Sequence, residues 1–269
     1  LWLQHMVIKL EWMVGRVTTH WIAVSQADRR QGLEWELFSA SKVSVVRPGI
    51  DPTAFAARID QAERDRLRAA LGVGPEQLLV GTVSCLKPQK SPEDFIRVAS
   101  LVCQRMPAAK CVLVGDGALR PQIEAMIHSH GLQDRVTLLG WRRDVASLLK
   151  AFDVFVLTSQ WEGLPCAILE ARASRIPIVA TRVGGSAEAI IEGIQGTLCP
   201  AGDVRAIASR VCQILGDERL RADLRNGTQE LPEEFTIQET VKQYQSLYTY
   251  LLHATRPAED MMKLQPNRL

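Results

Sequence analysis

Two lysines and two glutamates have the types and spacing needed to bind an anionic ligand that also carries hydroxyl groups. Lys87 and Lys90 come just before the segment SPEDFIRVASLVCQRM, and Glu162 and Glu170 are separated by seven residues within QWEGLPCAILEA. Ammonium groups bind phosphate oxygens, and carboxylates accept paired hydrogen bonds from the vicinal hydroxyls of a sugar or a ribose. These residues therefore predict a ligand with phosphate and sugar parts.

Glycines and helix starts accompany these side chains. Gly163 permits close approach of a ligand to the backbone, and a helix starting near Pro165 would direct free amides, including those near Leu164, into the same loop. The sequences VGDG, with Gly115 and Gly117, and VGG at 183–185 place further glycines after apolar runs. Each glycine taken singly is also explained by a turn. Their repeated placement favours one shared binding crevice.

Simpler roles stay open for the charged residues. Lys87 and Lys90 could be solvent-exposed loop cations without a ligand. Glu162 could complement the positive end of a helix, and Glu170 could be a surface residue. The pattern of charges alone does not decide between these roles and ligand binding.

The elements that must position these residues follow an alternating βα pattern from about residue 78 onward. Such a pattern predicts an α/β fold, a Rossmann-like parallel sheet with helices on both faces. Ligands of such sheets bind beyond the carboxyl ends of the strands, where QWEGLP and the two lysines are expected. In the helix expected over 91–106, Ser91 is a candidate cap and Pro92 takes the first position. We expect strands at 78–84, 110–116, 135–140, 153–159, 176–181 and 196–200.

Composition limits the function further. The chain has 269 residues, 32 basic and 30 acidic side chains, and no run of like charges, which argues against a nucleic-acid partner. Its six cysteines are scattered without metal-binding spacing, so buried thiols in a reducing, cytoplasmic setting are expected, and no metal site. Peripheral attachment to the inner membrane face is the open alternative.

The pattern divides the chain into four parts. Residues 1–49 combine an apolar helix over 1–17 with two short strands, too little for an independent α/β domain, so we expect them to be the end of an incomplete N-terminal domain plus a linker. Residues 50–235 form the ligand-binding domain, 236–255 a C-terminal helix, and 256–269 a flexible tail.

With these motifs in place, the chain resembles the retaining GT-B glycosyltransferases of group four, the glycosyl transferases group 1 type. EGLPCAILEA is similar to the family's E-x7-E signature, and LKPQKSPEDFI, LVGDGALR, VTLLGWRRDV, DVFVLTSQWEGLP and PIVATRVGGSAEAI match successive family blocks in order. The resemblance covers about residues 14 to 252 and identifies mainly the C-terminal, donor-binding half.

The resemblance implies a role for each matching residue. Lys90 would hold the diphosphate of a nucleotide-sugar donor, Glu170 the ribose hydroxyls, and Glu162 the hydroxyls of the transferred sugar. The amides of Gly163 and Leu164 would support the phosphates, and Trp141 and Arg142 of GWRR would lie against the base. Many members carry arginine where this chain has Cys85, so one phosphate contact is either missing or supplied by Lys87.

The implied activity is transfer of a sugar from a nucleoside diphosphate to an acceptor hydroxyl with retention at the anomeric carbon, in polysaccharide or glycolipid biosynthesis. Lys90 and Glu162 would be the catalytic residues, with no metal and no cofactor besides the donor substrate. The acceptor is unknown, and the missing N-terminal domain is the expected partner. Alternatives are a non-catalytic nucleotide-sugar-binding module, an inactive fragment, or another sugar-nucleotide enzyme such as an epimerase.

Overall fold

The computed structural model describes residues 2–227 and 231–255, so the tail expected at 256–269 lies outside the described residues. Its main domain is a parallel sheet with the strand order β5-β4-β3-β6-β7-β8. All six expected strands are present, and the predicted α/β class is confirmed. The strands are β3 (Leu78–Val83), β4 (Ala109–Val114), β5 (Val136–Leu138), β6 (Val154–Leu157), β7 (Ile178–Thr181) and β8 (Gly196–Cys199).

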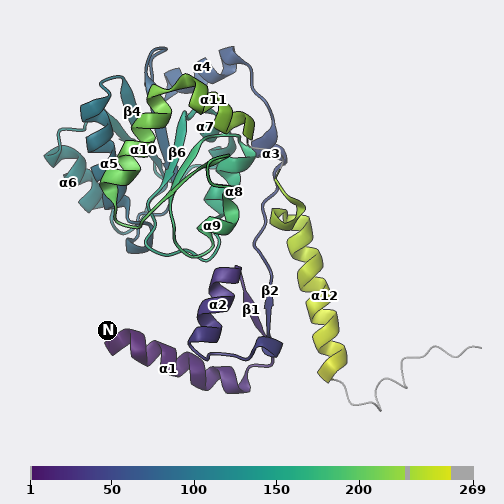
Figure 1. Ribbon diagram of the computed structural model, residues 1–269. Helices are drawn as coiled ribbons and strands as arrows, with labels where there is room; N and C mark the ends of the chain where they lie inside the picture. Colours follow the sequence, from purple (N-terminus) through teal and green to yellow (C-terminus); the bar gives the residue numbers. More distant parts are fainter. Residues whose placement is uncertain (1, 228–230, 256–269) are drawn as a thin grey trace, which may run out of the picture.

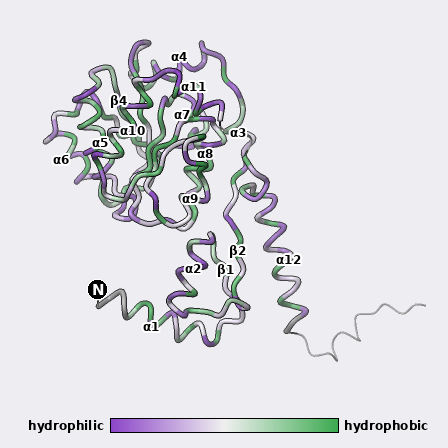
Figure 2. Tube along the Cα trace, in the orientation of Figure 1, coloured by the Kyte–Doolittle hydropathy of each residue, from purple (hydrophilic) through white to green (hydrophobic). Residues whose placement is uncertain are grey.

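Helices cover both faces of this sheet, and Figure 1 shows them wrapped around the central strands. Two separate cores fill the space, one beneath α5, α6 and α10, the other beneath α7 and α8. Figure 2 shows the strands as the most apolar part of the domain, as expected for strands buried on both sides. The helices are α3 (Thr53–Ala56), α4 (Gln61–Ala70), α5 (Pro92–Arg105), α6 (Arg120–Ser129), α7 (Val145–Ala151), α8 (Cys166–Ala173), α9 (Ser186–Ala189), α10 (Val204–Gly216) and α11 (Glu218–Gly227), with the 3-10 turns η2 (Pro88–Lys90) and η3 (Glu233–Phe235).

Residues 2–46 form a smaller unit beside this domain (Figure 1). Two short parallel strands pair there, and many apolar side chains of its first helix are exposed, among them Leu10, Met13 and Val17. Its elements are α1 (Trp2–Val17), β1 (Trp21–Ala23), α2 (Gln26–Glu34), η1 (Ala40–Lys42) and β2 (Val43–Val45).

The last helix, α12 (Ile237–Thr255), runs back alongside this smaller unit (Figure 1). Its start is fixed by backbone hydrogen bonds between Ile50 and the segment at Phe235 and Ile237, at 3.0 and 2.9 Å. Gly49 is required at this crossing, because a Cβ there would lie 2.2 Å from the backbone of Thr236. The linker and the C-terminal helix are thereby held together.

A buried carboxylate joins three elements at the amino edge of the sheet. Asp153, just before β6, accepts hydrogen bonds from the Leu79 amide at 2.8 Å, from Arg64 at 2.8 Å and from Arg68 at 3.0 Å. Burial by itself would raise the pKa of Asp153, but the Leu79 amide and the two guanidinium groups hold that pKa below its ordinary value. Asp153 therefore stays charged and ties α4 to the sheet.

We expect Asp153→Asn to lower the free energy of unfolding at neutral pH by about 3 kcal/mol, because it leaves two poorly exposed guanidinium groups without a charged partner. A lowered pKa in the folded state means that this stabilisation is present above the unfolded pKa and is lost as the pH falls through the folded value. The difference between wild type and variant should therefore shrink in acid. Urea unfolding measures it, with Asp144→Asn, at an exposed ion pair, as the matched control expected to change stability by less than about 0.5 kcal/mol. Equal losses for the two variants would contradict the role of Asp153.

Candidate functional site

The strand order reverses direction between β3 and β6, and the loops that follow these two strands meet at the carboxyl edge of the sheet. Lys90 lies on the loop after β3 and Glu162 on the loop after β6. Their side chains are in direct contact, with Lys90 Nζ 2.5 Å from Glu162 Oε1. Ser159 Oγ donates to the same carboxylate oxygen at 2.6 Å. The two residues that the sequence predicted as catalytic are thus brought together, at the position where open parallel sheets bind ligands.

The two loops are connected by several further hydrogen bonds. Gln160 N donates to Gln89 O at 2.8 Å, and the hydroxyl of Thr158 donates to the carbonyl oxygens of Lys90 and Ser91 at 3.1 and 2.9 Å. These bonds fix the backbone on both sides of the Lys90–Glu162 contact. The site is therefore held by the scaffold before any ligand arrives.

The expected capping role of Ser91 is wrong in its details. Ser91 does precede α5, but its backbone is left-handed, with φ of 44°, and its hydroxyl donates to Asp94 Oδ2 at 2.8 Å instead of accepting from a helix amide. Asp94 is buried and also accepts from Gln160 at 3.1 Å. The left-handed turn lets the chain enter α5 directly after Lys90, and Asp94 holds the neighbouring loop.

Glu170 lies on α8 and is partly buried, and its carboxyl group makes no hydrogen bond or ion pair with any described residue. Burial raises its pKa to about 7. Burial also raises the pKa of the Cys166 thiol, one turn earlier; the charges of Glu170 and Glu162 raise it further, and the charge of Lys90 opposes the shift. All three groups therefore lie near Cys166. The Glu170 carboxyl group keeps its full acceptor capacity.

Gly163 and the VGG segment permit two loop backbones and the side chain of Val24 to come close together. Gly185 N donates to Gly163 O at 2.8 Å, and a Cβ on Gly184, whose φ is 45°, would lie 1.7 Å from Glu162 O. A Cβ on Gly163 would lie 2.6 Å from Val24. Leu164 is buried in the core beneath α8. These glycines are thus explained by packing around Glu162, and contact of Gly163 and Leu164 with a ligand stays a prediction.

Gly115 and Gly117 also have a steric explanation. A Cβ on Gly115, which has φ of 135°, would lie 2.0 Å from Ser84 O, and one on Gly117 would lie 2.5 Å from Leu86 O. Both glycines let the loop after β4 pack against the loop that carries Lys87 and Lys90. Their expected role in ligand binding stays a prediction.

The remaining residues predicted to contact the ligand lie at the same edge of the sheet but are exposed at the protein surface. The Lys87 side chain is exposed and makes no hydrogen bond or ion pair within the described ranges. Trp141 follows β5 and is 68% exposed, and Arg142 beside it forms a two-point ion pair with Asp144 at 2.6 and 2.8 Å. An exposed indole and a free ammonium group are available to a ligand that extends outward from the crevice.

A pocket of about 350 Å³ opens beside Glu162, between α2 and the loops after β6 and β7. Asp28 and Gln31 of α2 line it, and sequence reasoning missed both. Burial raises the pKa of Asp28, although the Ser25 hydroxyl opposes that shift. No sequence signal links α2 to Glu162, because the two are brought together only by the docking of the smaller unit.

That docking depends on Glu188 of α9. Its carboxylate accepts hydrogen bonds from the Gln26 and Ala27 amides at 3.1 and 2.9 Å, and it pairs with Arg47 at 2.9 Å. The carboxylate thus satisfies free amides at the start of α2, where a helix is positive. Glu188 thereby positions one wall of the pocket.

In the described part of the chain, no three His, Cys, Asp or Glu side chains gather closely enough to hold a metal ion. None of the helices in the described ranges combines the length and apolar composition that a membrane crossing requires.

Comparison with known proteins relates this geometry to a family. The family model described as glycosyl transferases group 1 matches residues 63–231. The UDP-Gal:alpha-D-GlcNAc-diphosphoundecaprenol alpha-1,3-galactosyltransferase of Escherichia coli is 29% identical over 89% of this chain and 62% of its own length. The D-inositol 3-phosphate glycosyltransferase of Corynebacterium urealyticum is 29% identical over 84% of this chain and 55% of its own length. The chain thus spans about three fifths of these curated relatives.

Solved structures show the same relationship. Anabaena HepE in complex with UDP-glucose superposes with a TM-score of 0.77 and 26% identity, over 86% of this chain and 64% of that protein. The C-terminal domain of the group 1 glycosyl transferase LpcC from Francisella tularensis superposes with a TM-score of 0.60 over 67% of this chain and 94% of that domain, at 22% identity. The chain therefore belongs to the glycosyl transferases group 1 family, and its six-stranded domain has the architecture of the C-terminal half of a GT-B fold.

Proposed function

We propose that this chain binds a nucleoside diphosphate sugar at the carboxyl edge of β3 and β6 and takes part in transferring that sugar to an acceptor hydroxyl with retention of configuration. The observation that carries the proposal is the 2.5 Å contact of Lys90 with Glu162, next to the unpartnered carboxyl group of Glu170. The family relationship supports the proposal, as does the structure of HepE in complex with UDP-glucose, a protein 26% identical to this chain.

Each group would have a separate role. The ammonium group of Lys90 and the amino ends of α5 and α8 would face the diphosphate, whose negative charge increases as the glycosidic bond breaks. Glu162 would bind hydroxyls of the transferred sugar, and Glu170 those of the ribose. Gly163 and Leu164 would contribute backbone amides, and Trp141 with Arg142 would lie against the base.

The pocket beside Glu162 suits the reacting end of the donor. It adjoins the smaller unit, which we propose to be the last part of an acceptor-binding domain, with residues 50–235 as the donor domain and α12 as the returning C-terminal helix. With this domain assignment, we propose that the whole protein transfers a sugar in polysaccharide or glycolipid biosynthesis. Calorimetry with a panel of UDP-, GDP- and ADP-sugars tests donor binding, and no binding tighter than about 1 mM for any of them would refute it.

We expect Lys90→Ala to weaken binding of the nucleotide sugar by about 1.5–3 kcal/mol, the usual contribution of a hydrogen bond to a charged group. Lys87→Ala should weaken it less, because Lys87 is exposed and reaches the ligand only at the rim. Calorimetry on both variants compares these losses directly. A larger loss for Lys87 would mean that Lys87, not Lys90, is the main phosphate contact.

Glu162→Gln is expected to weaken binding of the nucleotide sugar without weakening binding of the nucleoside diphosphate alone. Plain nucleoside diphosphate should bind at least as well as before, within about 0.5 kcal/mol, because glutamine competes less for Lys90 than a carboxylate does. The sugar conjugate should lose about 1 kcal/mol or more, because an uncharged group accepts the sugar hydroxyls more weakly. Equal losses for the two ligands would refute contact of Glu162 with the sugar.

Donor affinity should also depend on pH through Glu170. Hydroxyl groups donate to the charged carboxylate, so binding favours deprotonation of a group whose pKa in the free protein is about 7. Affinity should therefore fall as the pH decreases, about tenfold between about pH 8 and about pH 6. Calorimetry with UDP-glucose suits the test, because its diphosphate does not titrate in this range. Glu170→Gln should bind weakly and without this dependence, and an unchanged pH profile in that variant would contradict the assignment.

A further inference from the structure

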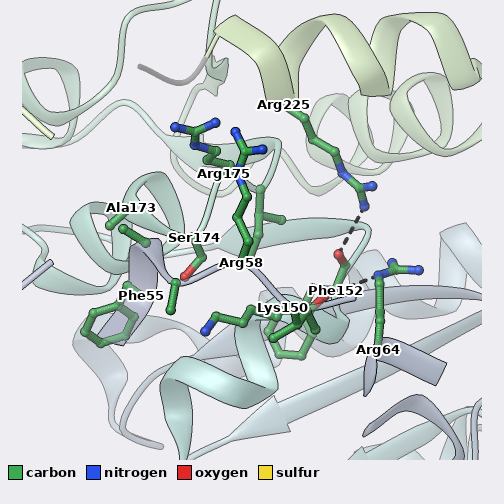
Figure 3. A pocket seen from close by; sticks show the side chains of 13 residues that line it. Phe55, Arg58, Arg64, Lys150, Phe152, Ala173, Ser174, Arg175 and Arg225 are labelled. Atoms are coloured by element: carbon green, nitrogen blue, oxygen red, sulfur yellow. Dashed lines mark hydrogen bonds between the residues drawn. The ribbon is translucent and has the colours of Figure 1, made fainter. Parts of the chain in front are cut away.

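A second pocket, of about 220 Å³, lies at the opposite edge of the sheet from Lys90 and Glu162. It is bordered by Phe152, which comes just before β6, and by Ile176, which comes just before β7. Nothing in the proposed transfer reaction uses this amino edge. Figure 3 shows the residues that form it, which come from α3 and the loop after it, from α4 and α11, and from the ends of α7 and α8 with the residues that follow them.

The lining of this pocket is strongly basic. Five cationic side chains border it and no acidic one does; they are Arg58, Arg64, Lys150, Arg175 and Arg225. Asp153 lies just beneath and pairs with Arg64 and Arg225 at 2.8 and 3.4 Å, but it also pairs with Arg68 at 3.0 Å. One carboxylate shared by three guanidinium groups leaves most of the positive charge without compensation.

Several polar groups here have no partner. The guanidinium groups of Arg58 and Arg175 make no hydrogen bond or ion pair with any described residue. The Ser174 hydroxyl is buried and likewise makes none there. In Figure 3, Ser174 and Lys150 project toward the middle of the pocket, and Arg58 and Arg175 lie along one side of it. Lys150 uses one of its three donors, at 3.0 Å from Ala54 O.

We propose that this pocket binds a small anion carrying a phosphate group. Guanidinium groups suit the paired oxygens of phosphate, and an ammonium group and a hydroxyl add single donors. The volume leaves room for a small organic part against Phe55 and Phe152, which is consistent with a phosphate ester of metabolite size.

The crowding of charge supports a ligand at this point. Arg225 has its pKa lowered, first by burial and then by the neighbouring charge of Arg64. Like charges held in a partly buried site destabilise the protein, and a bound dianion would remove that cost.

Inorganic phosphate is the probe for the test. The melting temperature is measured as phosphate replaces chloride, with the ionic strength held constant. Phosphate should stabilise the wild type and Lys90→Ala equally, which separates this pocket from the donor site. Arg58→Gln and Arg175→Gln should fold as well as wild type, because neither side chain has a partner to lose. Each should raise the phosphate dissociation constant about tenfold or more, as expected for loss of a charge-assisted hydrogen bond.

Arg205→Gln, an exposed arginine on α10 outside the pocket, is the matched control and should respond as wild type does. A second arm measures sedimentation with phosphatidic acid vesicles, which distinguishes a lipid phosphate from a soluble one. The proposal is overturned if phosphate stabilises no better than chloride, if the two pocket variants respond like Arg205→Gln, or if only vesicles bind.

Discussion

The contact between Lys90 and Glu162 depends on one feature of the sheet, the pairing of β3 with β6. Residues 84–153 separate these strands along the chain, yet their neighbouring carboxyl ends place a cation and an anion 2.5 Å apart. A strand order in which β3 and β6 were not neighbours would separate the two loops. Hydrogen bonds from Thr158 and Gln160 then fix the loops to each other, and the glycines at 184 and 185 let the loop after β7 pack against Glu162.

The Lys90–Glu162 pair also compensates for the burial of a carboxylate. The Glu162 side chain is only 5% exposed, and taking a carboxylate out of water is costly unless partners replace the water. Lys90 and Ser159 supply those partners. In the proposed function, a diphosphate would compete with Glu162 for Lys90, and sugar hydroxyls would replace the hydrogen bond that Glu162 loses. The proposed arrangement would therefore favour a ligand that carries both a diphosphate and a sugar over either part alone.

Much of this was predictable, because strands and helices follow local patterns. All six strands, the helix from Pro92 to Arg105 and the placement of Lys90 and Glu162 at one edge came from periodicity and from the rule for ligand sites in parallel sheets. The geometry of Ser91 and the packing of Gly115 and Gly117 against another loop did not, because these depend on neighbours distant in sequence. Asp28 was missed for the same reason. Likewise, the basic pocket gathers arginines from four separate segments that no motif connects.

A crystal structure of this chain with UDP-glucose tests the central claim most directly, because it shows which atoms Lys90 and Glu162 contact when a donor is present. We predict that Lys90 Nζ lies about 3 Å from a diphosphate oxygen, with the ribose hydroxyls on Glu170 and the sugar hydroxyls on Glu162. A donor bound elsewhere, with the Lys90–Glu162 contact unchanged and Glu170 still without a partner, would contradict the account.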